Sequence, residues 1–317
     1  MASAAYPGGS SSIVNKTNAD KFIPEIWSDE IVASYKKALV MANLINKMSM
    51  KGKKGDTLHI PVPTRGSAFA KAANTAVTIQ ADVETEVQVL LNKHFEYSRF
   101  IEDIVEVQAL SSLRRFYTED AGYALARQVD TDLIQLGRSA NNGAGTAAYA
   151  NAYIGGDGST AYTSGSPNAS ALTDAGIRRI IQRLDDNDVP MTDRYLVVPP
   201  SSRNTLMGIN RFTEQAFVGE TAGGNTIRNG QIGDVYGVKV FVTPQCDTAT
   251  GSARIALMFH KDAAVLAEQM GVRSQTQYKQ EYLATLFTSD MLYGVSLLRK
   301  GDLASVPTSM FPIAVPA

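Results

Sequence analysis

Thr57–Pro63 (TLHIPVP) and Val83–Leu91 (VETEVQVLL) carry the pattern that is most informative about the fold. In both, apolar residues alternate with polar residues or proline, which predicts strands with one apolar face each. Residues 64–76 between them are rich in small side chains, so the pattern predicts a long β-hairpin. Because proline cannot donate a ladder hydrogen bond, Pro61 and Pro63 place the first strand at an edge. A two-stranded ribbon is marginal in water, so its apolar face must lie on its own domain or on a neighbouring copy.

The region before the hairpin divides into a flexible arm and a helix. Residues 1–20 are rich in Ala, Ser, Gly and Asn, a composition typical of a disordered segment. Ser28 is a good N-cap residue, and apolar residues recur at helical spacing over Asp29–Lys47. We expect ordered structure to begin near Phe22 and to continue as this helix.

After the hairpin, apolar residues recur at helical spacing from Ile104 to Arg138 with no proline between them. At the rise of an α-helix this segment would be roughly 50 Å long. A domain of about 150 residues has a radius of gyration of about 15 Å. The helix must therefore run along the whole molecule or project from it.

The second half of the chain mixes helices, strands and glycine-rich loops. Residues 139–170 form a long loop of small and polar residues, and Thr173 then caps an amphipathic helix. A short strand, Tyr195–Val198, and a short helix from Ser201 come next. The apolar residues of the capped helix are Ile177, Ile180, Ile181 and Leu184.

Strands dominate the C-terminal part. A second glycine-rich loop spans Gly219–Gly233, and the strand-like segments after it are Val235–Val242, Arg254–Phe259, Val272–Tyr278 and Met291–Leu298. The final segment, Val306–Ala317, is uncharged and apolar. A free tail of that composition would be sticky, so we expect it to dock on another surface.

Composition narrows the function classes. The 317 residues carry 30 Lys and Arg against 31 Asp and Glu, a net charge of −1, which excludes a nucleic-acid binder that acts by bulk attraction. Charged residues make up only 19%, which is typical of a surface partly covered by partners. The single cysteine, Cys246, excludes an intramolecular disulfide and a thiolate zinc site. The N-terminus does not match a signal peptide and no apolar run is long enough to span a membrane, so we expect a cytosol-like compartment.

The sequence contains none of the common catalytic motifs. It has no Gly-x-Ser-x-Gly elbow, no Walker loop and no His-Glu-x-x-His. The three histidines, His59, His94 and His260, are scattered without the spacing of a metal site. We therefore predict no catalytic residue, no metal ligand and no cofactor.

The charged clusters have ordinary structural interpretations. Asp185–Asp188 fails as a calcium loop, because Val189 and Pro190 occupy a ligand position and the glycine position. Negative charge at a helix C-terminus is unfavourable, so an arginine partner, a cation or a solvated turn remain the alternatives. Asp130 and Asp132 are two apart on a helix and face in different directions. The basic pairs lack the interleaved aromatic residues of a nucleic-acid groove; they are Lys36-Lys37, Lys53-Lys54, Arg114-Arg115 and Arg178-Arg179.

The order of these elements resembles that of the major capsid proteins of tailed bacteriophages, which share the Hong Kong 97-like fold. The series is an arm, a long hairpin, a long helix, a mixed region with glycine-rich loops and a strand-rich return. The resemblance covers nearly the whole chain from about Phe22 onward. Its most recognisable segments are Phe22–Trp27, Gly55–Pro61, Ile101–Ile104, Gly230–Val240 and Leu257–Ala263.

The resemblance implies an α+β chain with the divisions of that family. These are an N-terminal arm and helix (1–50), an E-loop hairpin (51–93), a P-domain spine helix (94–140), an axial A-domain (141–265), and P-domain strands with the C-terminal tail (266–317). Contacts between subunits are then expected at Leu58, Ile60, Val62, Arg65, Lys71 and Phe311. Lys71, near the hairpin tip, is also a candidate for the covalent cross-link found in part of the family.

The resemblance also implies a structural protein rather than an enzyme. Copies would assemble in the host cytoplasm into pentamers and hexamers, and these would close an icosahedral virion shell around double-stranded DNA. The expected partners are further copies, a portal protein, a separate scaffolding protein, a decoration protein and DNA held by non-specific contacts, with no membrane. A scaffolding protein is expected because no long segment precedes the arm, unless such a segment has been removed.

Three other hypotheses stay open at the level of the sequence. An encapsulin-like nanocompartment shares the fold but encloses cargo enzymes. An enzyme could have an unrecognised site around Asp185–Asp188 and His260. A tail-tube or sheath protein would form helical polymers instead of closed shells.

Overall fold

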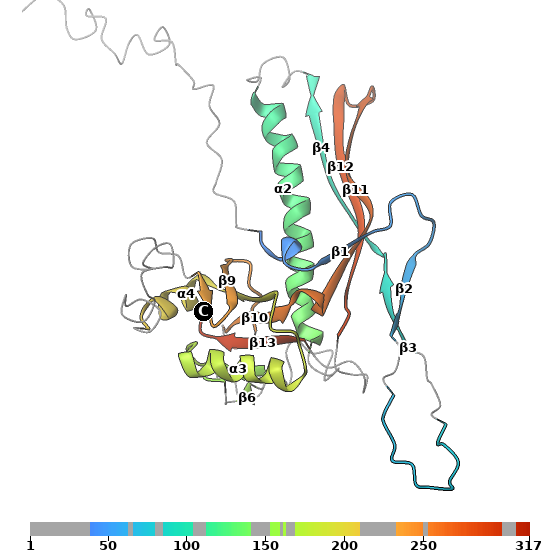
Figure 1. Ribbon diagram of the computed structural model, residues 1–317. Coiled ribbons are helices and arrows are strands. Elements are labelled where there is room, and N and C mark those ends of the chain that lie inside the picture. The colour runs from blue at the N-terminus through green and yellow to red at the C-terminus, as the bar shows by residue number, and fades with distance from the viewer. Residues whose placement is uncertain are drawn as a thin grey trace, which may run out of the picture.

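The computed structural model describes residues 39–62, 66–79, 85–103, 112–140, 153–158, 161–162, 169–209, 233–249, 253–299 and 309–317. In this part of the chain a long four-stranded ribbon stands beside one long helix, and a seven-stranded sheet lies at its lower end (Figure 1). A two-stranded hairpin leaves the ribbon on the other side and points away from the ribbon's upper end. The molecule is therefore elongated.

The ribbon is built on the longest strands of the described chain. β11 (Ala264–Lys279) and β12 (Ala284–Leu297) form an antiparallel hairpin, and β4 (Lys93–Glu102) pairs with β12. The short β1 (Asn46–Ser49) pairs in parallel with the first residues of β11. The strand order is β1-β11-β12-β4.

The long helix α2 (Ser112–Gln135) runs beside the ribbon and continues as a 3-10 turn, η4 (Leu136–Ser139) (Figure 1). Its buried residues Leu125, Val129 and Leu133 are four apart, so they form one stripe. They share a core cluster with Met291 and Tyr293 of β12. This stripe fixes the helix to the ribbon.

The seven-stranded sheet has the order β6-β5-β13-β10-β7-β9-β8. Two helices, α3 (Asp174–Asp186) and α4 (Pro200–Met207), belong to this part, and a 3-10 turn, η6 (Lys261–Ala263), leads from it into β11. Its strands are β5 (Tyr153–Gly155), β6 (Ala161–Tyr162), β7 (Arg194–Val198), β8 (Asp234–Val235), β9 (Val238–Val242), β10 (Arg254–His260) and β13 (Met310–Val315).

Local sequence signals account well for α3 and for the hairpin. The Thr173 side chain caps α3 by accepting a hydrogen bond from the Gly176 amide at 3.1 Å. The predicted apolar stripe is buried against the seven-stranded sheet at Ile177, Ile180 and Leu184. β2 (Thr57–Val62) and β3 (Thr85–Leu90) pair antiparallel, as the alternation predicted. The long helix is confirmed over 112–135, and residues 104–111 lie outside the described residues.

The helix predicted over Asp29–Lys47 is wrong in the part that the structure describes. Residues 41–43 form a 3-10 turn, η3 (Met41–Asn43), and Asn46–Ser49 form β1. Backbone pairing of β1 with β11 replaces the helical bonds, and Met41, Leu44 and Ile45 fill the core cluster from an irregular backbone. Residues 1–38, with the predicted arm and Ser28, lie outside the described residues.

The apolar C-terminal tail docks inside its own chain. β13 lies between β5 and β10 and is buried throughout. The tail therefore belongs to the seven-stranded sheet, whereas β11 and β12 belong to the ribbon.

The structure differs from the sequence prediction in several smaller ways, each of which depends on strand pairing. The predicted strand Val235–Val242 is a hairpin, β8 and β9, with a turn at Tyr236 and Gly237, which both have positive φ. The short strands β5 and β6 interrupt the predicted loop 139–170. β11 and β12 extend well beyond their predicted bounds because each stabilises the other along its length. The glycine-rich loop 219–233 lies outside the described residues except for Gly233.

Candidate functional site

The root of the hairpin is fixed to its own ribbon by a close backbone approach. A Cβ at Gly294 of β12 would overlap the Leu90 carbonyl oxygen and would lie 3.0 Å from the Leu90 carbonyl carbon. Beside this crossing, Val89 and Leu91 are buried in a small cluster with Met50, Val265 and Ala267. The hairpin therefore leaves the ribbon at a defined place.

The apolar face of the hairpin lies partly on this same cluster. Leu58 and Ile60 pack against it and are half-buried. Val62 is also half-buried, two residue pairs nearer the tip than Ile60. The sequence left two surfaces open for the apolar face of the hairpin, its own domain or a neighbouring copy. At the root of the hairpin, this face lies on its own domain.

Beyond β2 and β3 the hairpin continues as an exposed arm, residues 66–79 (Figure 1). Its apolar side chains are uncovered, with Phe69 60%, Val77 68% and Ile79 88% exposed. A turn at Ala72–Thr75 reverses the chain, with the Thr75 amide donating to the Ala72 carbonyl and Asn74 at a φ of 65°. Lys71 is exposed just before this turn, and Arg65 lies outside the described residues.

Polar pairs hold the outward face of the hairpin. His59 Nδ1 lies 2.9 Å from Glu86 Oε2, and Gln88 donates to Glu86 Oε1 at 2.6 Å. The Gln88 hydrogen bond, and then the His59 bond, lowers the pKa of Glu86 below its usual value. The His59 contact joins β2 to β3, whereas the Gln88 bond lies within β3, and the apolar side chains lie on the other face.

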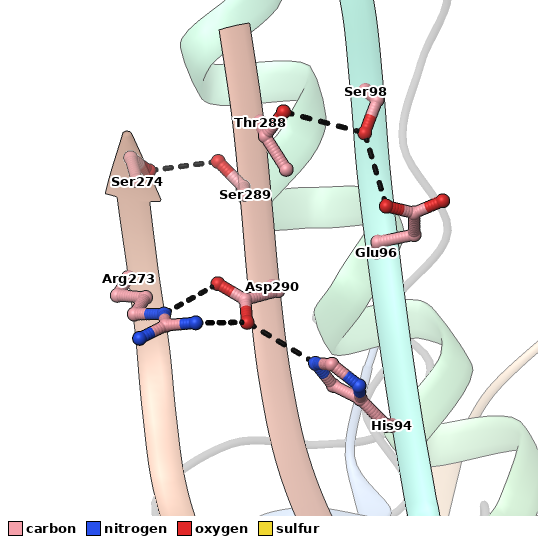
Figure 2. Close-up of polar contacts among 8 residues, drawn as sticks. All are labelled: His94, Glu96, Ser98, Arg273, Ser274, Thr288, Ser289 and Asp290. Carbon is pink, nitrogen blue, oxygen red and sulfur yellow. Dashed lines mark hydrogen bonds and ion pairs between the residues drawn. The ribbon is translucent and has the colours of Figure 1, made fainter. Parts of the chain in front are cut away.

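The ribbon face that points away from α2 carries a polar ladder across three strands (Figure 2). Arg273 of β11 binds Asp290 of β12 through two bonds of 2.8 and 2.9 Å, and His94 of β4 lies 3.1 Å from the same carboxylate. Arg273 first, and His94 to a smaller extent, lower the pKa of Asp290. Farther along, Ser98 bonds to Glu96 and Thr288.

The opposite face of the ribbon is joined to α2 by a buried polar cluster. Asp132 accepts a hydrogen bond from Tyr293 at 2.7 Å, pairs with Lys93 at 2.9 Å and accepts another bond from Gln128. Burial, and then the bond to Asp132, raises the pKa of Tyr293. This cluster spans α2, β4 and β12, so it sets their relative positions.

Asp130 faces a different partner from Asp132, as their spacing predicted. Its Oδ1 accepts a bond from the Met41 amide at 2.7 Å. The carboxyl group is buried, and burial raises its pKa although the amides of residues 40–42 oppose the shift. Asp130 therefore fixes η3 to the long helix.

The acidic cluster at the end of α3 has an arginine partner. Arg194 is buried and binds Asp185 at 2.6 Å, and it also donates to the Val189 and Pro190 carbonyls. Within the described residues, no three His, Cys, Asp or Glu side chains are placed to hold a metal ion. His260 is buried, where its Nδ1 accepts a bond from the Asp262 amide and burial lowers its pKa.

The expectation that Phe311 contacts another subunit is wrong for its side chain. Phe311 belongs to β13 and is only 6% exposed, inside the core of the seven-stranded sheet. Sequence reasoning recognised that the tail is too apolar to be free, but gave it the wrong partner.

None of the helices in the described ranges is both long and apolar enough to cross a membrane.

A model of a protein family, described as phage capsid protein, matches residues 42–306. The chain belongs to this family. The match includes the ribbon, the long helix, the hairpin and most of the seven-stranded sheet. A comparison with curated protein sequences finds no match.

Solved structures from phages share the fold of this capsid protein over nearly its whole length. A structure from Mycobacterium phage Che8 is 23% identical, covers 92% of this chain and 97% of its own, and has a TM-score of 0.72. The capsid of cyanophage P-SCSP1u is 18% identical, covers 98% and 99%, and also has a TM-score of 0.72. The head of Helicobacter pylori bacteriophage KHP40 is 12% identical, covers 95% and 98%, and has a TM-score of 0.69.

The capsid protein therefore has the Hong Kong 97-like fold that its element order suggested. It is a phage capsid protein of mixed α+β structure, and therefore a protein of the capsid shell. Sequence reasoning missed Gly294 and the β1 strand, which depend on contacts between segments far apart in the chain.

Proposed function

We propose that this capsid protein assembles into pentamers and hexamers that close an icosahedral head shell around double-stranded DNA. The observation that carries the proposal is the exposed arm 66–79, whose side chains Phe69, Val77 and Ile79 lie free of the chain's own core. An extended segment with exposed apolar residues is stabilised only when another molecule covers it. Because the chain belongs to a family of capsid proteins, we infer that this other molecule is a further copy of the chain.

The surface chemistry supports binding among many copies rather than bulk attraction to DNA. The net charge is −1, so DNA contacts would be local and non-specific. The arm, the ribbon and the hairpin root offer several separate surfaces, and a large shell is held by many such contacts. A separate scaffolding protein, a portal protein and a decoration protein complete the proposed set of partners, with assembly in the host cytoplasm.

The test is assembly of the full chain, alone and with a scaffolding protein from the same phage, followed by electron microscopy and sedimentation velocity. Closed shells or rings of five and six copies support the proposal. Helical tubes, or a monodisperse small oligomer under both conditions, would overturn it.

A pair of variants links assembly to the arm. The triple change Phe69→Ser, Val77→Ser and Ile79→Ser removes the exposed apolar side chains without touching the core and should abolish or weaken shells. Met191→Ser is the control, because Met191 is 75% exposed on the seven-stranded part and also loses an apolar side chain. Normal shells from the triple variant would contradict the role of the arm.

A further inference from the structure

The helix α3, which packs on the seven-stranded sheet (Figure 1), carries positive charge that its own chain does not neutralise. Arg179 and Arg183 are four residues apart, so their side chains are neighbours on the helix surface, and like charges at this spacing destabilise a helix. Burial, and then the charge of Arg179, lowers the pKa of Arg183. In the described part of the chain neither arginine has an ion-pair partner. An anion beside them would relieve the repulsion.

A pocket of about 380 Å³ opens beside Arg179. Its volume is within the range of about 300–1,000 Å³ that is usual for small-molecule sites. Arg178 is held at the pocket by an ion pair with Asp174 at 3.1 Å. The side chains of Arg179 and Gln182 have no hydrogen-bond partner among the described residues. The pocket therefore presents two donor groups that are free to bind a ligand. Its lining residues are Asp157, Ala175, Arg178, Arg179 and Gln182.

One wall of the pocket is a turn, residues 156–158, that packs tightly against α3. A Cβ at Gly176 of the helix would overlap the Gly156 carbonyl oxygen. Gly158 has a φ of 73°, and a Cβ there would lie 2.8 Å from Arg179 Cβ. The Thr173 amide donates to the Gly156 carbonyl at 3.1 Å. These contacts fix the helix on the turn before any ligand arrives, which lowers the cost of binding.

The chemistry of the pocket suits a small anion better than a polyanion. Guanidinium groups match phosphate and carboxylate oxygens in charge and geometry. Three exposed carboxylates follow at the end of the same helix, Asp185, Asp186 and Asp188. DNA lying along α3 would meet these carboxylates as well as the arginines, whereas a compact anion would meet only Asp157 within the pocket.

We propose that this pocket binds one compact oxyanion, either a free phosphate ion or the phosphate group of a small molecule. Arg179 and Gln182 donate hydrogen bonds to it, and Arg178, positioned by Asp174, adds a second positive charge. The bound anion also offsets the repulsion between Arg179 and Arg183. All of these residues belong to one copy, so the inference does not depend on the proposed shell function.

The first test is calorimetric titration of the unassembled full chain with sodium phosphate at neutral pH, compared with sodium chloride at equal ionic strength. Phosphate should bind saturably at one site. Arg179→Gln should weaken binding at least about tenfold, because a hydrogen bond to a charged group is lost, and Gln182→Ala should weaken it by a smaller factor. Arg127→Gln is the matched control, since Arg127 is an exposed arginine on α2. The absence of saturable binding, or equal binding by Arg179→Gln, would overturn the inference.

A change of opposite sign tests the location of the site. Asp157 lines the pocket and its negative charge opposes an anion there. Asp157→Asn should therefore tighten phosphate binding, while the Arg179→Gln change weakens it. Unchanged or weaker binding by Asp157→Asn would show that the anion lies elsewhere and would contradict the assignment.

Two further titrations identify the source of the phosphate group. Glycerol 3-phosphate that binds more tightly than inorganic phosphate assigns the pocket to a phosphorylated small molecule, and equal or weaker binding assigns it to the free ion. Either result supports the inference if Arg179→Gln reduces it. A short DNA duplex that displaces phosphate at an equal concentration of phosphate groups would overturn the assignment to a compact anion. Failure of the chain to form shells would overturn the proposed function and leave this inference standing.

Discussion

Replacing Gly294 by alanine should loosen the hairpin from the ribbon. The added Cβ would overlap the Leu90 carbonyl oxygen and would lie 3.0 Å from the Leu90 carbonyl carbon and 3.2 Å from Leu91 Cα. These are backbone atoms, which cannot move aside by a rotamer change. The root of β3 must therefore shift or detach.

The magnitude follows from the cheaper of these two responses. Forcing an extra methyl group into a packed site costs about 1–3 kcal/mol. Full detachment would expose Val89, now 0% exposed, and Leu91, now 6% exposed, at about 1.5–3 kcal/mol each. Since detachment costs more, we expect a loss of about 1–3 kcal/mol for Gly294→Ala, and a larger loss for Gly294→Val.

The assay is equilibrium unfolding of unassembled subunits in urea, with hydrogen exchange of residues 85–91 as a local readout. Gly122→Ala in α2 is the matched control, because a Cβ there meets nothing within 4 Å and should stabilise the helix by about 0.5–1 kcal/mol. Unfolding of Gly294→Ala at the same urea concentration as the natural protein, with unchanged exchange at 85–91, would refute the argument that backbone contact fixes the hairpin root.

Three further changes test other parts of the structure by the same unfolding measurement. Asp132→Ala leaves the buried Tyr293 hydroxyl and the Lys93 ammonium without their shared partner. It should lower the free energy of unfolding by about 3 kcal/mol, the lower end for a broken buried pair, because the Lys93 side chain is still 32% exposed. A loss under about 1 kcal/mol would mean that water replaces the carboxylate. Thr173→Ala removes the cap of α3 and should cost about 1 kcal/mol, whereas Thr173→Ser should be nearly neutral; equal losses from both would show that the hydroxyl is not the cause. Arg273 and His94 lower the pKa of Asp290 below its ordinary value of 3.8. The contribution of Asp290 to stability is therefore present above that value and is lost as pH falls through the lower, folded pKa. Asp290→Asn should reduce this loss of stability in acid, and an unchanged dependence of stability on pH would contradict the argument.

The elements that depend on neighbouring residues could be predicted from the amino-acid sequence. Alternation predicted β2 and β3, helical spacing predicted α2 and α3, and the Thr173 cap marked where α3 begins. The element order also indicated the capsid fold, which the family match and the solved structures confirm. These signals are local because side-chain period and capping act within one or two turns of the backbone.

Pairing between segments that are far apart in the chain could not be predicted in this way, because it depends on tertiary contacts. The apolar pattern before residue 50 suited a helix, yet Asn46–Ser49 lies as a strand on β11 because pairing and burial there outweigh local propensity. The tail was correctly expected to dock, but β10 and β5, not a second subunit, receive Phe311 and its neighbours. The role of Gly294 and the pocket beside α3 have no sequence signature, since each depends on which backbone lies beside it in space.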